Sequence, residues 1–336
     1  MHAVFSDTTY TEQTWLLIVK PIVIFLFLLL VTPMVLLLER KLMGRMQSRC
    51  GPNRVGPWGL MQPLADVIKL LTKENSTPVT AVPWMMTIAP MISVLTAVMT
   101  LAVVPWGDRG TWGSSYGLYG IDVPIGILYM FAFGSIAFYG FLLGGWASGS
   151  KFSFLGSMRS AAQLISYEVS LGLALLGVVF MSQTLSLVGI VNAQHGLWYI
   201  VPQFVGFCIF LVAGFAETAR PPFDLPEADA ELVAGYNTEY GGMRFGAFYM
   251  AEYMHIIVFS GLATALFLGG WHGPGPVALG PLWVTLKMFL MVCFFIWARA
   301  TFPRLRYDQL MSFGWKVLLP LATVNALVTA ILVVVT

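Results

Sequence analysis

Residues 15–38 read WLLIVKPIVIFLFLLLVTPMVLLL, a stretch of 24 residues in which Lys20 carries the only charge. A helix of about 20 apolar residues is long enough to cross the roughly 30 Å of hydrocarbon in a bilayer. Asp7 and Glu12 precede this stretch, and it is longer than the apolar region of a signal peptide. We therefore predict a transmembrane helix here and not a cleaved signal.

The rest of the composition agrees with this beginning. The 336 residues are 58% hydrophobic and 10% charged, against about 25% charged residues in soluble domains. The chain has no run of the alternating, roughly ten-residue segments that are typical of membrane β-barrels. We predict an all-α polytopic membrane protein, with residues 1–336 in a single membrane domain. Eight apolar stretches are the expected spans: residues 15–38, 84–105, 123–146, 164–187, 199–215, 247–269, 282–300 and 313–335.

The positions of the basic residues predict the orientation. Of the 18 Lys and Arg residues, 15 lie in or beside the connections that follow spans one, three, five and seven. The positive-inside rule places those connections in the cytoplasm or its topological equivalent, so both termini are expected on the outer side. Lys20 and Lys287 fall inside spans, from which long side chains can reach the lipid headgroups.

The first cytoplasmic-side connection, residues 39–78, contains a second kind of helix. Within residues 57–73, apolar side chains recur at helical spacing and polar side chains occupy the other faces. We predict an interfacial helix on the inner leaflet, in contact with membrane lipids. A cytoplasmic helix packed against a partner protein is the alternative. The apolar residues are Leu60, Met61, Leu64, Val67, Ile68 and Leu71.

The sequence has no signature of a cofactor site. Its three cysteines, Cys50, Cys208 and Cys293, stand alone, and the four histidines are scattered. A glycine-rich nucleotide loop is also lacking. We expect no metal ion, redox cofactor or nucleic-acid partner for this chain.

Three carboxylates lie within or at the end of predicted spans. Glu168 and Glu252 come about five residues after the expected beginnings of spans four and six, and Glu217 closes span five. An acidic residue at the centre of a membrane helix costs on the order of 2.5–3.5 kcal/mol. We expect the three to cluster in the cytoplasmic leaflet as part of a proton path. The alternative is a structural role, in helix-to-helix hydrogen bonds or an ion pair with a buried arginine.

The connection at residues 217–246 is unusual because it is acidic on the side where the other connections are basic. Six carboxylates against Arg220 and Arg244 leave a net charge of −4, and three prolines stiffen its first half. Carboxylates packed together repel, so some should have a raised pKa and hold protons near neutral pH. We predict a proton relay, with a solvated acidic loop as the alternative. The carboxylates are Glu217, Asp224, Glu227, Asp229, Glu231 and Glu239.

Long motifs along the chain resemble one family, the quinone-site membrane subunit, or H subunit, of NADH:quinone oxidoreductase (respiratory complex I). The resemblance extends from Leu16 into the last helix. The motifs are Glu39-Arg-Lys, Arg49-x-Gly-Pro-Asn-Arg-Val-Gly-Pro, Gln62-Pro-x-Ala-Asp66-x-x-Lys69, Arg159-x-x-Ala-Gln-x-x-Ser-Tyr-Glu168, Ala216-Glu-Thr-x-Arg220-x-Pro-Phe-Asp224-Leu-x-Glu227 and Glu231-Leu-Val-x-Gly-Tyr-Asn-x-Glu239-Tyr.

The resemblance implies a proton-pumping oxidoreductase subunit that carries no cofactor of its own. Its partners would be the peripheral-arm subunits, which hold NADH, FMN and iron–sulfur clusters, and the neighbouring membrane-arm subunits. A quinone chamber would lie between the first helix, the interfacial helix and the sixth span. Carried onto this chain, the chamber wall would include Arg40, Arg49, Asp66, Arg220 and Phe223, and the proton or charge relay would comprise Glu168, Glu217, Asp224, Glu227, Asp229, Glu231 and Glu252.

This interpretation predicts that quinone reduction drives remote proton pumping through the acidic residues. The expected location is the bacterial inner membrane, with an organellar inner membrane as the alternative. Two residues depart from the family pattern: Asp229 replaces the usual Glu, and His255 stands where Asn is common. The alternatives in function are a hydrogenase-linked or ferredoxin-linked member of the same superfamily, an autonomous ion antiporter and a passive membrane anchor.

Overall fold

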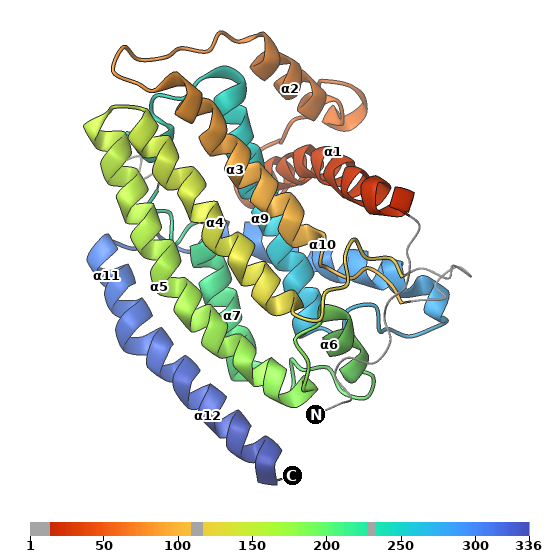
Figure 1. Cartoon of the computed structure of the whole chain (residues 1–336). Coiled ribbons are helices and arrows are strands. Elements are labelled where there is room, and N and C mark those ends of the chain that lie inside the picture. The colour runs from red at the N-terminus through yellow and green to blue at the C-terminus, as the bar shows by residue number, and fades with distance from the viewer. Residues whose placement is uncertain (1–13, 109–116, 227–232, 336) are drawn as a thin grey trace.

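A computed structural model describes residues 14–108, 117–226 and 233–335, which are mostly helical (Figure 1). Within these residues the β-type pairing is limited to an isolated bridge between Gly107 and Leu118. The predicted all-α class is therefore confirmed. The helices are α1 Thr14–Met46, α2 Gln62–Thr72, α3 Pro83–Leu101, α4 Gly126–Ala147, α5 Lys151–Ser182, α6 Leu187–Ala193, α7 Phe204–Glu217, α9 Gly242–Leu266, α10 Gly280–Thr301, α11 Tyr307–Phe313 and α12 Leu319–Val335.

The predicted spans correspond to eight of these apolar helical segments. In the described part of the chain, seven are long and apolar enough to cross a membrane, and α7 is a shorter apolar helix of 14 residues. Our fifth span, residues 199–215, was wrong at its beginning, because residues 199–203 form turns and α7 begins at Phe204. The last span runs from α11 into α12 through a π-helical turn at Gly314–Leu318. The orientation of the termini stays a prediction.

Helix α5 begins 13 residues before the predicted span. The first half of the helix buries small polar side chains, Ser153, Ser157 and Ser160, together with Gln163. These residues pack against protein and not lipid. The helix therefore extends into a part of the sequence whose hydropathy is too low to predict a span. Glu168 is consequently the eighteenth of 32 residues and lies near the middle of the helix, not five residues from its beginning.

Helix α9 also begins earlier than the predicted span, which started at residue 247. It begins at Gly242, so Glu252 is its eleventh residue, and Arg244 and Gly246 belong to the helix and not to the preceding acidic connection. The connection that we predicted as residues 217–246 is therefore shorter, and a 3₁₀ turn at Gly235–Asn237 interrupts it.

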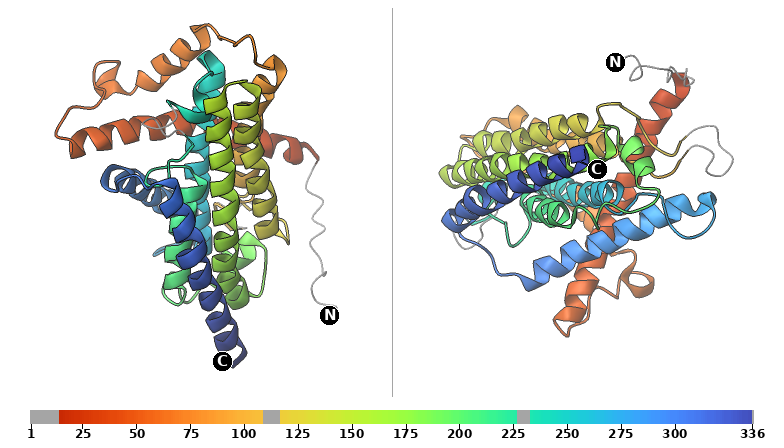
Figure 2. Two further views of the ribbon diagram at one scale, coloured as in Figure 1. Left: turned by 90° about the vertical axis from the view of Figure 1, so that its left-hand side faces the viewer. Right: turned by 90° about the horizontal axis from the view of Figure 1, so that it is seen from below.

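The helices form a bundle around α9. Helix α3 packs on α4 and α9, α5 packs on α4, α7 and α12, and α10 packs on α9 and α1. Figure 2 shows α1, in red, lying across the long axes of α4 and α5. Small residues permit the closest approaches. At Gly140 of α4, for example, an added Cβ would collide with the Ser93 hydroxyl of α3.

Helix α2 lies beyond one end of the bundle and contacts α1 and α9 (Figure 1). It is shorter than the predicted 57–73, because a 3₁₀ turn at Pro57–Gly59 precedes it. All six apolar residues of the predicted helix are exposed in this chain. Such a face suits a lipid surface, and the interfacial position remains a prediction.

Our expectation for Lys287 was wrong. Its side chain is only 7% exposed and does not extend toward headgroups. The ammonium group donates hydrogen bonds to the carbonyls of Leu268, Gly270 and His272, at 2.6, 2.8 and 2.7 Å. Carbonyls at and beyond a helix C-terminus lack helical partners and favour a cation. The lysine therefore fixes the chain as it leaves α9.

Candidate functional site

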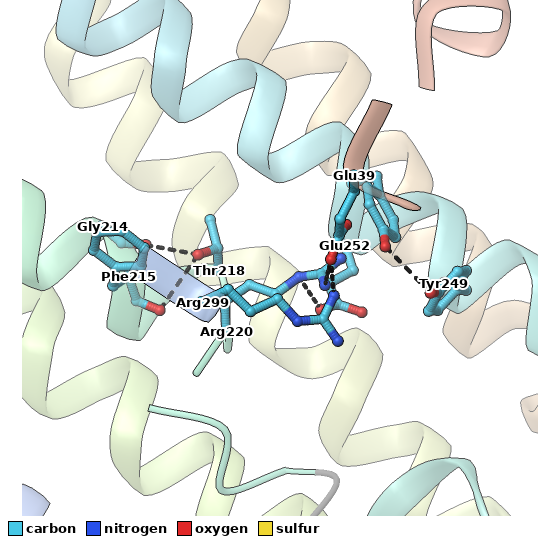
Figure 3. Close-up of polar contacts among 9 residues, drawn as sticks. Glu39, Gly214, Phe215, Thr218, Arg220, Tyr249, Glu252 and Arg299 are labelled. Atoms are coloured by element: carbon cyan, nitrogen blue, oxygen red, sulfur yellow. Dashed lines mark hydrogen bonds and ion pairs between the residues drawn. The ribbon is translucent and has the colours of Figure 1, made fainter. Parts of the chain in front are cut away.

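Four charged side chains from four parts of the chain meet inside the bundle (Figure 3). Arg220, in the segment after α7, places its Nε 2.5 Å from Oε1 of Glu252 on α9. Its Nη1 lies 3.6 Å from Oε1 of Glu39 on α1. Arg299 of α10 forms an ion pair with the same Glu39 oxygen. We call these four residues the charge network.

Burial makes the pairing necessary. Glu39, Arg220 and Glu252 are 2%, 3% and 8% exposed, and an isolated buried charge costs several kcal/mol. The network holds two positive and two negative groups, so its formal charges balance. Burial alone would lower the pKa of Arg220, but the charges of Glu252 and Glu39 outweigh burial and raise that pKa. The guanidinium is therefore charged at any physiological pH.

Tyr253 of α9 completes the network. Its ring centroid is 4.2 Å from Cζ of Arg220, a distance at which a cation is attracted to an aromatic face. Its hydroxyl is hydrogen-bonded to Glu39 and lies 3.2 Å from the hydroxyl of Tyr249, one turn earlier. The two tyrosines connect the charge network to the surface of α9 that faces α1.

Hydrogen bonds from α5 and α7 hold Arg220 in place. The backbone N–H of Arg220 donates to the carbonyl of Phe215 at 3.3 Å. Nε2 of Gln163, buried on α5, donates to the carbonyls of Ala216 and Phe223 at 2.7 and 2.8 Å. Thr218 caps the end of α7 by donating to the Gly214 carbonyl. The backbone between α7 and Phe223 is therefore fixed against α5.

An apolar cavity of about 150 Å³ lies between α1, α2 and α9, the three helices between which we predicted the quinone chamber. Tyr249 and Tyr253 line it beside the charge network. On the α2 side it reaches Asp66, which forms an ion pair with Arg40 at 2.7 Å. The other lining residues are Leu29, Thr32, Pro33, Leu36, Pro63, Val67, Leu70, Met243, Gly246 and Met250.

The five residues predicted for the chamber wall separate in the structure. Asp66 lines the cavity, and Arg40 reaches it through Asp66. Arg220 does not line the cavity but contacts the ring of Tyr253, which does, and belongs to the charge network. Phe223 is buried in the core, with its ring 5.5 Å from that of Tyr167. Arg49 is exposed and donates to the side chain of Gln47, away from the cavity lining.

The acidic residues fall into two groups. Glu252 belongs to the charge network, whereas Glu168 and Glu217 line a smaller cavity of about 20 Å³, together with His255 of α9. Ser135 of α4 donates a hydrogen bond to Glu168. A space of this size can hold roughly one water molecule. Asp224 is partly buried after α7, and Glu227, Asp229 and Glu231 lie outside the described residues.

Sequence reasoning missed Glu39, Tyr253 and Arg299 as site residues. In the sequence, Glu39 is only a motif residue and Arg299 only a charge at the end of a span. The position of Glu39 directly after 24 largely apolar residues could have identified it, because a carboxylate there needs a cation as partner once the helix is packed. The sequence does not show which cation pairs with Glu39, because Arg299 is 260 residues away.

In the described parts of the chain, no group of three or more His, Cys, Asp or Glu side chains could hold a metal ion. Fold and site together define a polytopic α-helical membrane protein with an apolar cavity, a buried charge network and a partly buried pair of glutamates. Helix α9 lines the apolar cavity, carries Glu252 of the charge network and borders the glutamate pair through His255.

Comparison with known proteins specifies the family. The family model for NADH dehydrogenase matches residues 19–330. The chain is 52% identical to the NADH-quinone oxidoreductase H subunit numbered 1 in Geobacter metallireducens and to the one numbered 2 in Geobacter sulfurreducens, each over 92% of this chain and 94% of the relative. It is 49% identical to the H subunit numbered 2 in Syntrophobacter fumaroxidans, over 95% and 96% of the two chains. The chain belongs to the NADH dehydrogenase family, and the resemblance read from its motifs is confirmed.

Proposed function

We propose that this chain is the membrane subunit of a proton-pumping NADH:quinone oxidoreductase in a bacterial inner membrane, and that it admits quinone and passes protons or charge to its neighbours. The names of its relatives, which are H subunits of NADH-quinone oxidoreductase, support the reaction and the assembly. The proposed partners are the peripheral-arm subunits with NADH, FMN and iron–sulfur clusters, the neighbouring membrane subunits and membrane lipids.

The observation that carries the proposal is the arrangement along α9. The apolar cavity lies beside Tyr249 and Tyr253, the charge network includes Glu252, and the cavity with Glu168 and Glu217 borders His255. A quinone has a long apolar tail, and the lining of the first cavity is almost wholly apolar. Reducing a quinone to a quinol adds two electrons and two protons, so protons are taken up at one end of α9 close to buried ionisable groups.

The relay is tested with Glu217→Gln, which keeps the shape of the side chain and removes its ability to release a proton. We expect coupled quinone reduction by NADH to fall at least about tenfold, with normal amounts of assembled complex. The matched control is Glu74→Gln, a change at an exposed carboxylate. Electron transfer from NADH to an artificial acceptor measures assembly. Full proton pumping in Glu217→Gln would refute the relay.

The cavity is tested separately with Met250→Trp, which fills the space between α1, α2 and α9. We expect the KM for quinone to rise several-fold while electron transfer to the artificial acceptor is unchanged. Leu26→Trp, at an exposed position of α1, is the control for added bulk. An unaltered KM in Met250→Trp would show that quinone does not enter through this cavity.

A further inference from the structure

His255 lies where the two acidic groups come closest along α9. It follows Glu252 by three residues on the same helix, a rise of about 4.5 Å. Glu252 belongs to the charge network, whereas His255 lines the small cavity together with Glu168 and Glu217. The imidazole is thus the ionisable side chain of α9 that borders the glutamate pair.

The hydrogen bonds of His255 fix which ring nitrogen keeps a free lone pair. The ring is hydrogen-bonded to the backbone of Ser93 on α3, and its Nε2 is buried without a partner. The bond to Ser93 therefore involves Nδ1. Since a carbonyl oxygen only accepts, Nδ1 carries the hydrogen, and Nε2 keeps a lone pair that can accept a hydrogen bond.

The cavity beside His255 suits a bound water molecule. The cavity of about 20 Å³ has room for roughly one water. Its ionisable lining groups, apart from the imidazole, are Glu168 from α5 and Glu217 from α7; α3 contributes Thr100, and α4 contributes Gly134 and apolar side chains. A buried water molecule makes about three hydrogen bonds, and two carboxyl groups with one imidazole nitrogen supply that number.

We infer that His255 is a positioning residue of the glutamate pair: its Nε2 accepts a hydrogen bond from a water molecule and holds that water between Glu168 and Glu217. This inference rests on the proposed function. The water directs one hydrogen to Nε2 and the other to an ionised carboxylate, while its oxygen accepts the proton of the other, protonated carboxyl. When that proton moves onto the water, the water passes a proton to the carboxylate, and the imidazole is unchanged.

The test compares three substitutions in the assembled complex. His255→Leu removes the acceptor and keeps an apolar side chain in place, whereas His255→Asn and His255→Gln each retain an amide oxygen that can accept from water. We expect coupled quinone reduction and proton pumping to fall about tenfold or more in His255→Leu. Asn or Gln should restore at least half of the wild-type rate. His195→Leu, at an exposed position, is the matched control.

Two outcomes would overturn the inference: a wild-type rate in His255→Leu, or an equal loss in Leu, Asn and Gln, which would mean that only packing matters. Each rate is divided by the rate with an artificial acceptor, so that poor assembly is not mistaken for lost coupling. Glu217→Gln separates this inference from the proposed function. If Glu217→Gln retains pumping, the relay itself is wrong; if it loses pumping while His255→Leu retains it, only the role of His255 is wrong.

Discussion

The middle and the C-terminal end of α9 neutralise buried charge in different ways. Near its middle, Glu252 meets Arg220, which also lies close to Glu39, so cations are balanced by carboxylates. Beyond its last residue, Leu266, the ammonium of Lys287 is balanced by three backbone carbonyls and by the Trp198 ring, whose centroid is 4.3 Å away. The same helix thus borders an ionic network near its middle and a lysine held by neutral groups at its C-terminal end.

The two regions differ in whether their groups can change charge. A carboxylate can take up a proton, and its partners can rearrange when its charge is lost. A backbone carbonyl has no such second state, so the contacts of Lys287 hold one geometry. We therefore expect substitutions near Glu252 to affect coupling, and substitutions near Lys287 to affect stability alone. Four predictions test this comparison, from the largest effect to the smallest.

The largest effect is expected for Arg220→Met. The change leaves Glu39 and Glu252 buried with Arg299 as the remaining cation of the network, and breaking a buried ion pair from one side costs about 3–5 kcal/mol. The amount of assembled complex in the membrane should fall severely. Arg306→Met, at an exposed ion pair with Asp308, should leave assembly unchanged. Normal assembly of Arg220→Met would mean that the network does not support the fold.

Glu252→Gln should act on activity more than on assembly. The amide keeps the size of the side chain and can still accept a hydrogen bond from Arg220, but it cannot carry a negative charge. We expect coupled quinone reduction to fall about tenfold, measured as a ratio to electron transfer to an artificial acceptor. A normal ratio would favour the alternative of a passive anchor and would remove the functional half of the comparison.

Lys287→Met should lower stability and leave activity nearly unchanged. The substitution leaves carbonyls of residues 268, 270 and 272 without their shared donor, at a cost of about 1–3 kcal/mol. The midpoint of thermal inactivation of the complex should fall by several degrees, while the rate per assembled complex stays within twofold. A change in coupling as large as that of Glu252→Gln would contradict the assignment of this end to stability.

The smallest effect concerns acid sensitivity beyond α9. Burial lowers the pKa of His272 from its ordinary 6.5, partly offset by a hydrogen bond to the Val191 backbone. The unfolded chain therefore binds a proton on this residue more readily, so its contribution to stability is complete above pH 6.5 and declines as pH falls below that value. His272→Asn should flatten the loss of thermal stability between pH 7 and pH 5. An identical acid slope in both proteins would exclude this role.

The positions of the helices along the chain were largely predictable. Bilayer hydrocarbon cannot satisfy backbone polar groups, so long apolar stretches such as residues 15–38 must be helical. The ends were less predictable wherever a helix continues inside protein. Ser153, Ser157 and Gln163 of α5 read as a connection because hydropathy records only polarity, and the structure shows that the three are buried against protein.

The candidate site was predictable in part. Glu168, Glu217 and Glu252 stood out because a carboxylate in an apolar stretch needs a reason to be there. The division of these three between a charge network and a separate cavity could not be predicted, because it depends on how each helix is rotated about its axis in the bundle. Arg49 belongs to a long family motif, and its side chain is exposed and away from the cavity in this chain, so its role in the chamber wall stays a prediction.

By itself, the sequence determined that this protein is a polytopic helical membrane protein of the NADH dehydrogenase family, because hydropathy and long motifs are local properties of the chain. Only the tertiary structure decided which buried charges neutralise one another. Glu39 meets Arg220 and Arg299 across most of the chain, and His255 lines a cavity with two glutamates from other helices. Such contacts depend on the crossing and rotation of packed helices, which no local stretch of sequence specifies.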